Sequence, residues 1–295
     1  MKAALAAIIT AFLAACAPLN PPPEALPQPA KATAPCAIPT RPKVLVTAFP
    51  LRAPEQLGLG EFFAWPQATA EELARALARS GRLRAAAAPQ QVAFASLTGE
   101  PELSRDAAGA PQLIAWAKEA GAQYVIAGLI LDFGRSTHWL VVPERGLALE
   151  ARLYDGLTGR LLARQAFERR ERFAGPLPYH LTPGTREFAT TRFGAAYQEL
   201  IAALTDWAEA AIACRPLAVR VTRIEGRRLT LEGGFDAGLF PGAALSLAPP
   251  SGPGAPRPDA WVREVKADQA IAELGFHRDP QAIRPGEAFY LLARP

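Results

Sequence analysis

The sequence predicts an α/β protein that ends in a small all-β barrel. Up to residue 214, short apolar runs of strand type alternate with segments whose apolar residues recur at helical spacing. After residue 214 the helical spacing is lost, and short β-type runs follow one another around proline and glycine turns. We therefore expect two folded domains, residues 43–214 and residues 215–295.

The α/β part begins with a buried strand and a helix. Residues 43–50 form an apolar, β-rich run that ends at a proline, as a buried strand does. Thr69 to Glu72 fit a capping box, in which a hydroxyl and a carboxylate bind free backbone N–H groups at a helix start. An apolar face follows, and Gly81 is placed to cap the helix end. The residues of that face are Ala70, Leu73, Ala74 and Leu77.

The remaining elements complete a layered α/β unit. Residues 82–88 predict a second strand, and Pro111 and Gly121 bracket a second helix. Residues 123–133 form the most apolar strand, and residues 147–155 and 160–170 form a hairpin around the turn at 156–159. A long helix is expected over roughly 188–213, since apolar residues recur there at helical spacing. This order of elements predicts a compact α/β layer structure.

The C-terminal part contains two matching corners. Residues 219–231 alternate in β style around Glu225-Gly226. Two later strands each start at a proline–glycine pair, Pro241-Gly242 and Pro285-Gly286. Equivalent corners of this kind predict a small closed barrel whose strands enter from equivalent turns.

The N-terminus predicts export and lipid attachment. Lys2 precedes an apolar stretch over residues 3–15, which is too short to span a bilayer and is typical of a signal peptide. The stretch ends Leu13-Ala14-Ala15-Cys16, which resembles the lipobox of bacterial lipoproteins. That resemblance implies cleavage after residue 15 and lipidation of Cys16. The alternative is an ordinary signal peptide that contains a cysteine. Position 17 is alanine and not the usual inner-membrane retention aspartate, which favours the periplasmic face of the outer membrane.

A proline-rich linker and two further cysteines follow. Nine prolines lie between residues 17 and 42, so residues 16–42 are expected to form an extended spacer and not a domain. Cys36 and Cys214 remain once Cys16 carries lipid, and an even pair in an oxidising compartment predicts a disulfide. Two independent buried thiols are the alternative.

The sequence holds no recognisable catalytic, cofactor or metal motif. The histidines His138, His180 and His277 are far apart in sequence, and none has a partner at metal-ligand spacing. Asp132-Phe133-Gly134 lacks the other kinase motifs and fits a strand end. Glu71 and Glu72 are adjacent near a predicted helix start, where they suit the helix dipole and do not form a paired-acid site.

Structural roles also explain the other polar and aromatic residues of note. Asp155 is placed to bind the backbone of the turn that follows it, and the dispersed tryptophans fit core or interface anchors. The formal charge of +4 is spread over mixed acids and bases, which disfavours a nucleic-acid partner. We therefore expect neither an enzyme nor a small-molecule binding protein.

Three stretches of the chain resemble the flagellar assembly protein T family. They are VLVTAFPL at 44–51, GAQYVIAGLILDFG with ARLYDGLTGRLLARQAF at 121–134 and 151–167, and the passage from FATTRFGAAY at 188–197 to CRPLAVRVTRIEGRRLTLEGGFDAGLFPGAAL at 214–245. The resemblance spans roughly residues 43–295, and the shared order of the motifs makes the case.

This resemblance implies a middle domain like the N-terminal domain of TolB, followed by a small barrel. It also implies a periplasmic ring, made of several copies, around the LP ring of the flagellar basal body, with basal-body ring proteins as partners. We expect the separate N-terminal domain of the longer family members to be missing, with the lipid anchor and linker in its place, so any stator recruitment by that domain is not implied. The strand GAQYVIAGLI with its hairpin also resembles outer-membrane lipoproteins that activate peptidoglycan synthases, and CsgG-like secretion proteins. The predicted C-terminal barrel favours the resemblance to the flagellar family over these alternatives.

Overall fold

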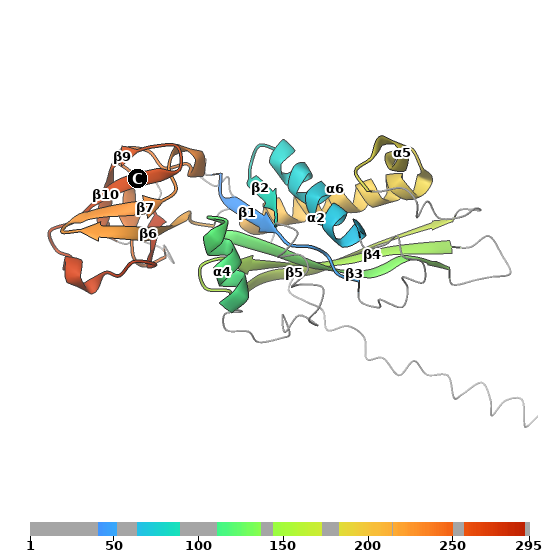
Figure 1. Ribbon diagram of the computed structural model, residues 1–295, viewed down its shortest axis with the longest axis horizontal. Helices are drawn as coiled ribbons and strands as arrows, with labels where there is room; N and C mark the ends of the chain where they lie inside the picture. Colours follow the sequence, from blue (N-terminus) through green and yellow to red (C-terminus); the bar gives the residue numbers. More distant parts are fainter. Residues whose placement is uncertain are drawn as a thin grey trace, which may run out of the picture.

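The described residues form a five-stranded sheet with helices on both faces and, beside it, a closed β-barrel (Figure 1). The structure is a computed structural model and describes residues 41–51, 64–88, 111–136, 144–172, 183–213, 215–249 and 257–292. We call the part formed by residues up to 213 the sheet unit and the part from residue 215 onward the barrel. This arrangement agrees with the expected α/β class and closed barrel.

The sheet combines a parallel half with an antiparallel half. Its order is β2-β1-β3-β4-β5, in which β1 lies parallel to both β2 and β3, while β3, β4 and β5 run antiparallel. The antiparallel half is the predicted hairpin together with the strand before it. The strands are β1 (Lys43–Val46), β2 (Arg84–Ala87), β3 (Tyr124–Ser136), β4 (Glu144–Asp155) and β5 (Leu161–Arg172).

Helices cover both faces of the sheet (Figure 1). Helices α2 (Ala64–Arg79) and α6 (Arg192–Ile212) lie on one face, and α4 (Pro111–Glu119) lies on the other. The larger core lies under α2 and α6, and a smaller apolar cluster lies under α4. Alternate residues of β3 supply the two cores, because successive side chains of a strand point to opposite faces: Ile126 faces the larger core and Val125 the smaller one.

The predicted capping box is wrong. Helix α2 begins at Ala64, so Thr69 lies inside the helix, where its side chain is fully buried. Glu72 is also buried and pairs with Arg75 and Arg79 instead of binding free N–H groups at a helix start. A threonine three residues before a glutamate can stand at a helix start or inside a helix, so the spacing alone does not separate the two cases. Here the helix already includes Trp65, which is buried in the core.

The single long helix predicted over 188–213 is two helices. Helix α5 (Arg186–Ala189) ends at Thr190, and α6 starts after Thr191, whose hydroxyl accepts a bond from the Gly194 amide at 2.8 Å. A Cβ at Gly194 would lie 1.9 Å from the Phe188 carbonyl oxygen, so only glycine permits this corner. The corner brings Phe188 to 5.2 Å from Trp65 in an edge-on ring contact, which ties α2 and α5 together.

The barrel confirms the paired corners. Its order is β10-β7-β6-β11-β8-β9, closed on itself. Gly242 and Gly286 both adopt positive φ, at 83° and 97°, and strands β8 and β11 that follow them are hydrogen-bonded neighbours. The strands are β6 (Ala218–Glu225), β7 (Arg228–Glu232), β8 (Ala244–Ser246), β9 (Ala260–Val265), β10 (Gln269–Leu274) and β11 (Ala288–Leu291).

Several predictions fall on residues outside those described. They concern Cys16, Cys36, Cys214, His138 and His180, together with the signal peptide and the linker. Within the described part of the chain, no helix combines the length and apolar character needed to cross a bilayer.

Candidate functional site

The polar residues noted in the sequence have structural roles where the structure describes them. The Asp155 carboxylate accepts bonds from the amides of Leu157 and Thr158, at 2.8 and 3.0 Å, as predicted for the turn. His277 lies 3.4 Å from the carboxylate of Asp259 in the barrel. Among the described residues, no three His, Cys, Asp or Glu side chains come together in a way that could hold a metal ion.

A buried charge network lies on the face of the sheet that also carries α4. Glu150 is 6% exposed and accepts bonds from Arg152 at 2.6 Å and Arg164 at 2.5 Å. Burial alone would raise the pKa of this carboxyl, but the two arginine hydrogen bonds outweigh it and hold the pKa below its usual range. Paired in this way, the three side chains tie β4 to β5.

The junction between the sheet unit and the barrel is the candidate functional site. The Gln123 side chain, at the start of β3, donates to the Ala218 carbonyl at the start of β6. Arg84 of β2 pairs with Asp236 of the barrel at 3.5 Å. These contacts come from different strands, so they restrain the barrel in more than one direction.

Arg220 makes the most deeply buried of these contacts. It lies on β6 between Val219 and Val221, whose side chains point into the barrel core. Alternation therefore directs Arg220 out of the barrel, where the sheet unit covers it until only 7% is exposed. Its guanidinium donates to the Gly156 carbonyl at 2.5 Å.

The charge of Arg220 is balanced by acids from both units. Burial lowers the pKa of its guanidinium, while the carboxylates of Glu232 and Asp155 act in the opposite direction. Glu232 belongs to the barrel and Asp155 to the sheet unit. An arginine stays charged even with such a lowered pKa, so the junction contains a permanent buried cation between two acids.

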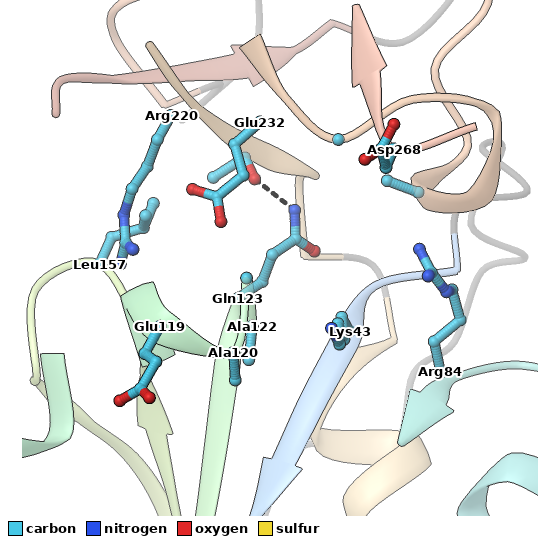
Figure 2. Close-up of a pocket in the computed structure, with 14 residues that line it drawn as sticks. Lys43, Arg84, Glu119, Ala120, Ala122, Gln123, Leu157, Arg220, Glu232 and Asp268 are labelled. Carbon is cyan, nitrogen blue, oxygen red and sulfur yellow. Dashed lines mark hydrogen bonds between the residues drawn. The ribbon is translucent and has the colours of Figure 1, made fainter. Parts of the chain in front are cut away.

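A pocket of about 270 Å³ lies within the junction (Figure 2). Figure 2 shows Arg220 and Glu232 entering it from the barrel and Lys43, Arg84 and Gln123 from the sheet unit. Its charged lining residues are Lys43, Arg84, Glu119, Arg220, Glu232 and Asp268. Cations and acids are equal in number, so the lining has no net attraction for either an anion or a cation.

Two glycines lie at the junction, one against the barrel and one packed within the sheet unit. A Cβ at Gly121, where φ is +59°, would lie 2.9 Å from a carboxylate oxygen of Glu232. A Cβ at Gly156, whose carbonyl accepts from Arg220, would lie 2.8 Å from the Ala122 carbonyl oxygen, so this close contact is within the sheet unit. Both glycines were noted in the sequence only as a helix end and a turn residue, so their part in the junction was missed.

The side chains at the junction make direct contacts between the two units. The pocket lining contains amide, ammonium, guanidinium and carboxylate groups and no serine, cysteine or histidine. The Arg220–Gly156 hydrogen bond and the Arg84–Asp236 ion pair join the two units with definite geometry, so they favour one relative orientation.

Residues 35–174 match the family described as flagellar assembly protein T, middle domain. No curated protein matches the sequence at a significant level.

Solved structures give weaker likenesses. The hypothetical protein CT253 from Chlamydia trachomatis is 19% identical, with a TM-score of 0.43 over 58% of this chain and 98% of that one. The LpoB C-terminal domain from Escherichia coli is 20% identical, with a TM-score of 0.29 over 45% and 84%. TolB from Acinetobacter baumannii is 16% identical, with a TM-score of 0.28 over 68% and 38%. TM-scores this low do not establish a shared fold.

Proposed function

We propose that the protein is a non-enzymatic structural component of the bacterial flagellar basal body, because residues 35–174 match the flagellar assembly protein T middle-domain family. The match carries this proposal. It spans all five strands of the sheet unit, from β1 to β5, so it concerns a whole folded layer and not an isolated motif.

The junction supports a structural role. A scaffold protein must hold its binding surfaces at fixed positions, and the junction holds the barrel against the sheet unit through Arg220, Gln123 and Arg84. In the proposal, the protein joins other copies of itself and the neighbouring basal-body proteins in a periplasmic ring around the LP ring. The sheet unit corresponds to the TolB N-terminal-like middle domain, residues 43–214, and the barrel to residues 215–295.

The proposed location is the periplasmic face of the outer membrane. The signal peptide, residues 1–15, is removed and Cys16 carries the lipid. The linker after it, at about 3.1 Å per residue in extended form, lets the folded part stand several tens of ångströms from the lipid. A disulfide between Cys36 and Cys214 then ties the end of the linker to the boundary between the two domains.

Deletion of the gene tests this function in living cells. The proposal expects loss or strong reduction of swimming, restored by the full chain and restored poorly by a Cys16→Ser variant that cannot be lipidated. The rival function, regulation of peptidoglycan synthesis or a CsgG-like secretion role, predicts normal swimming. Incorporation of a fluorescent D-amino acid into the cell wall, measured in the same strains, separates the two. Normal swimming with reduced incorporation would replace the flagellar proposal with the rival.

A further inference from the structure

Arg220 has more hydrogen-bond donors than its contacts use. Its guanidinium carries five N–H groups, and one of them binds the Gly156 carbonyl. Within the described part of the chain, the guanidinium has no other hydrogen-bond partner and no carboxylate at ion-pair distance. Yet the residue is only 7% exposed, and buried arginines are normally paired. Because Arg220 lines the junction pocket, its unused donors are available to a molecule in that pocket.

Glu232, on the neighbouring strand β7, lacks a direct partner in the same way. A Cβ at Gly121 would lie 2.9 Å from one of its carboxylate oxygens, so the carboxylate rests against the turn that ends α4. The C-terminal end of a helix carries partial negative charge, and Glu119 in the last turn adds another carboxylate. Among the described residues, Arg84 is the only charged residue of the pocket lining that has an ion-pair partner. The carboxylates at the end of α4 therefore have no direct counter-ion.

The charges of Arg220 and Glu232 do not neutralise each other by contact. Glu232 is close enough to oppose the fall in the pKa of Arg220 that burial causes. Figure 2 shows both side chains entering the pocket from the barrel. Their charged atoms nevertheless stay beyond ion-pair distance. A molecule that carries both an anionic and a cationic group would satisfy both side chains at once.

We propose that the junction pocket binds a small zwitterion of the amino-acid class, a free α-amino acid or a dipeptide. Its carboxylate binds the guanidinium of Arg220, for which a pair of parallel hydrogen bonds is a favoured geometry. Its ammonium group binds the Glu232 carboxylate beside the C-terminal end of α4, where a cation is stabilised. The sequence alone favoured no small-molecule partner, since neither residue stands in a recognisable motif.

The size and charge of the pocket both fit this class of ligand. Its volume of about 270 Å³ lies just below the range of about 300–1,000 Å³ that is typical of sites for drug-sized ligands, so it suits a smaller molecule. Its lining holds three cations and three acids, which favours a neutral molecule with separated charges over a simple ion. A phosphate would be repelled by Glu232 and Glu119, and a metal ion would find no cluster of three suitable ligands in the part of the chain that the structure describes.

Binding of such a molecule is coupled to the junction. Arg220 and Glu232 belong to the barrel, whereas Glu119 and Gly121 belong to the sheet unit. A ligand between them binds only the docked arrangement, so it stabilises that arrangement more as its concentration rises. The inference does not rest on the flagellar role. Normal swimming after deletion of the gene would leave the binding site intact, and absence of binding would leave the prediction for swimming intact.

Isothermal titration calorimetry with the purified full chain tests the proposal. The probes are the standard α-amino acids and the dipeptides glycylglycine and alanylalanine. We expect at least one probe to bind with a dissociation constant below about 1 mM and to raise the melting temperature as its concentration rises. For the tightest probe, the N-acetyl derivative lacks the ammonium charge and the methyl ester lacks the carboxylate charge. Each derivative should bind at least about tenfold more weakly, because each loses a hydrogen bond between charged groups.

Two matched variants locate the site. Glu232→Gln keeps the size of the side chain and removes its charge, and Glu225→Gln makes the same change at a side chain of β6 that is 57% exposed. Glu232→Gln should raise the dissociation constant of the tightest probe at least about tenfold, and Glu225→Gln should leave it unchanged. The derivatives are compared on the parent protein, so that comparison stays decisive even if Glu232→Gln is less stable. No binding of any probe at millimolar concentration, equal binding of the probe and its two derivatives, or equal dissociation constants for the parent and Glu232→Gln would each overturn the proposal.

Discussion

Replacing Arg220 with methionine should destabilise the junction by about 2–3 kcal/mol. Methionine keeps most of the side chain's length and apolar bulk but removes its charge and its donors. The change leaves the Gly156 carbonyl, now bonded at 2.5 Å, without its donor. An unsatisfied buried polar group costs about 1–3 kcal/mol, and loss of the cation between Glu232 and Asp155 adds to that cost.

Arg223→Met is the matched control. Arg223 lies on the same strand, but its side chain is 72% exposed and its pair with Glu225, at 2.6 Å, is on the surface. Exposed pairs of this kind contribute about 0–1 kcal/mol. The two variants therefore make the same chemical change on β6 and differ only in whether the sheet unit covers the arginine.

Urea unfolding followed by circular dichroism measures the difference. With a slope of about 2 kcal/mol per molar urea, Arg220→Met should lower the midpoint by about 1 M, and Arg223→Met should lower it far less. Limited proteolysis should also cut the Arg220→Met variant faster between α6 and β6, since the barrel is no longer held against the sheet unit. Equal midpoints for the two variants would refute the reasoning that Arg220 locks the junction.

Three further predictions concern the sheet unit and the cysteines. Gly194→Ala should cost at least about 2–3 kcal/mol, measured as a lower melting temperature, because its Cβ would lie 1.9 Å from the Phe188 carbonyl oxygen; a melting temperature within a degree of the parent would contradict this. Glu150 has a folded-state pKa below its unfolded value of about 4.3, so its contribution to stability is present above that pH and is lost as the pH falls through the folded pKa. The stabilities of the parent and Glu150→Gln, measured by urea titration, should thus differ most near pH 6, and the difference should shrink as the pH falls below about 4.3. A difference that does not shrink in acid would be evidence against the network. Peptide mapping without reductant should find Cys36 linked to Cys214, and two free thiols would disprove that disulfide.

Local patterns in the sequence were sufficient where the structure depends on a few neighbouring residues. The corners at Pro241-Gly242 and Pro285-Gly286 were predicted because a proline–glycine pair sets a turn locally, and both glycines adopt positive φ. The turn after Asp155 was predicted for the same reason, since its carboxylate binds amides two and three residues away.

The errors arose where distant contacts override local signals. Thr69 and Glu72 have the spacing of a capping box, yet they lie inside α2. Thr191 is a typical N-cap residue, and its side chain accepts a bond from the Gly194 amide at the start of α6. The apolar spacing continues across this point, so the sequence predicted one longer helix.

The junction could not be predicted from the sequence. Arg220 alternates with two valines just as a solvent-facing residue of a barrel strand does. Only the placement of the sheet unit against that face makes it buried, and such placement leaves no periodic pattern in the sequence.

Imaging of basal bodies tests the proposed function most directly. Electron cryotomography of cells that lack the gene, with averaging of their motors, should show missing density around the LP ring. The density should return when the full chain is restored, and it should return incompletely with the Arg220→Met variant. Motors whose rings are indistinguishable from the parent's would contradict the assignment to the basal body.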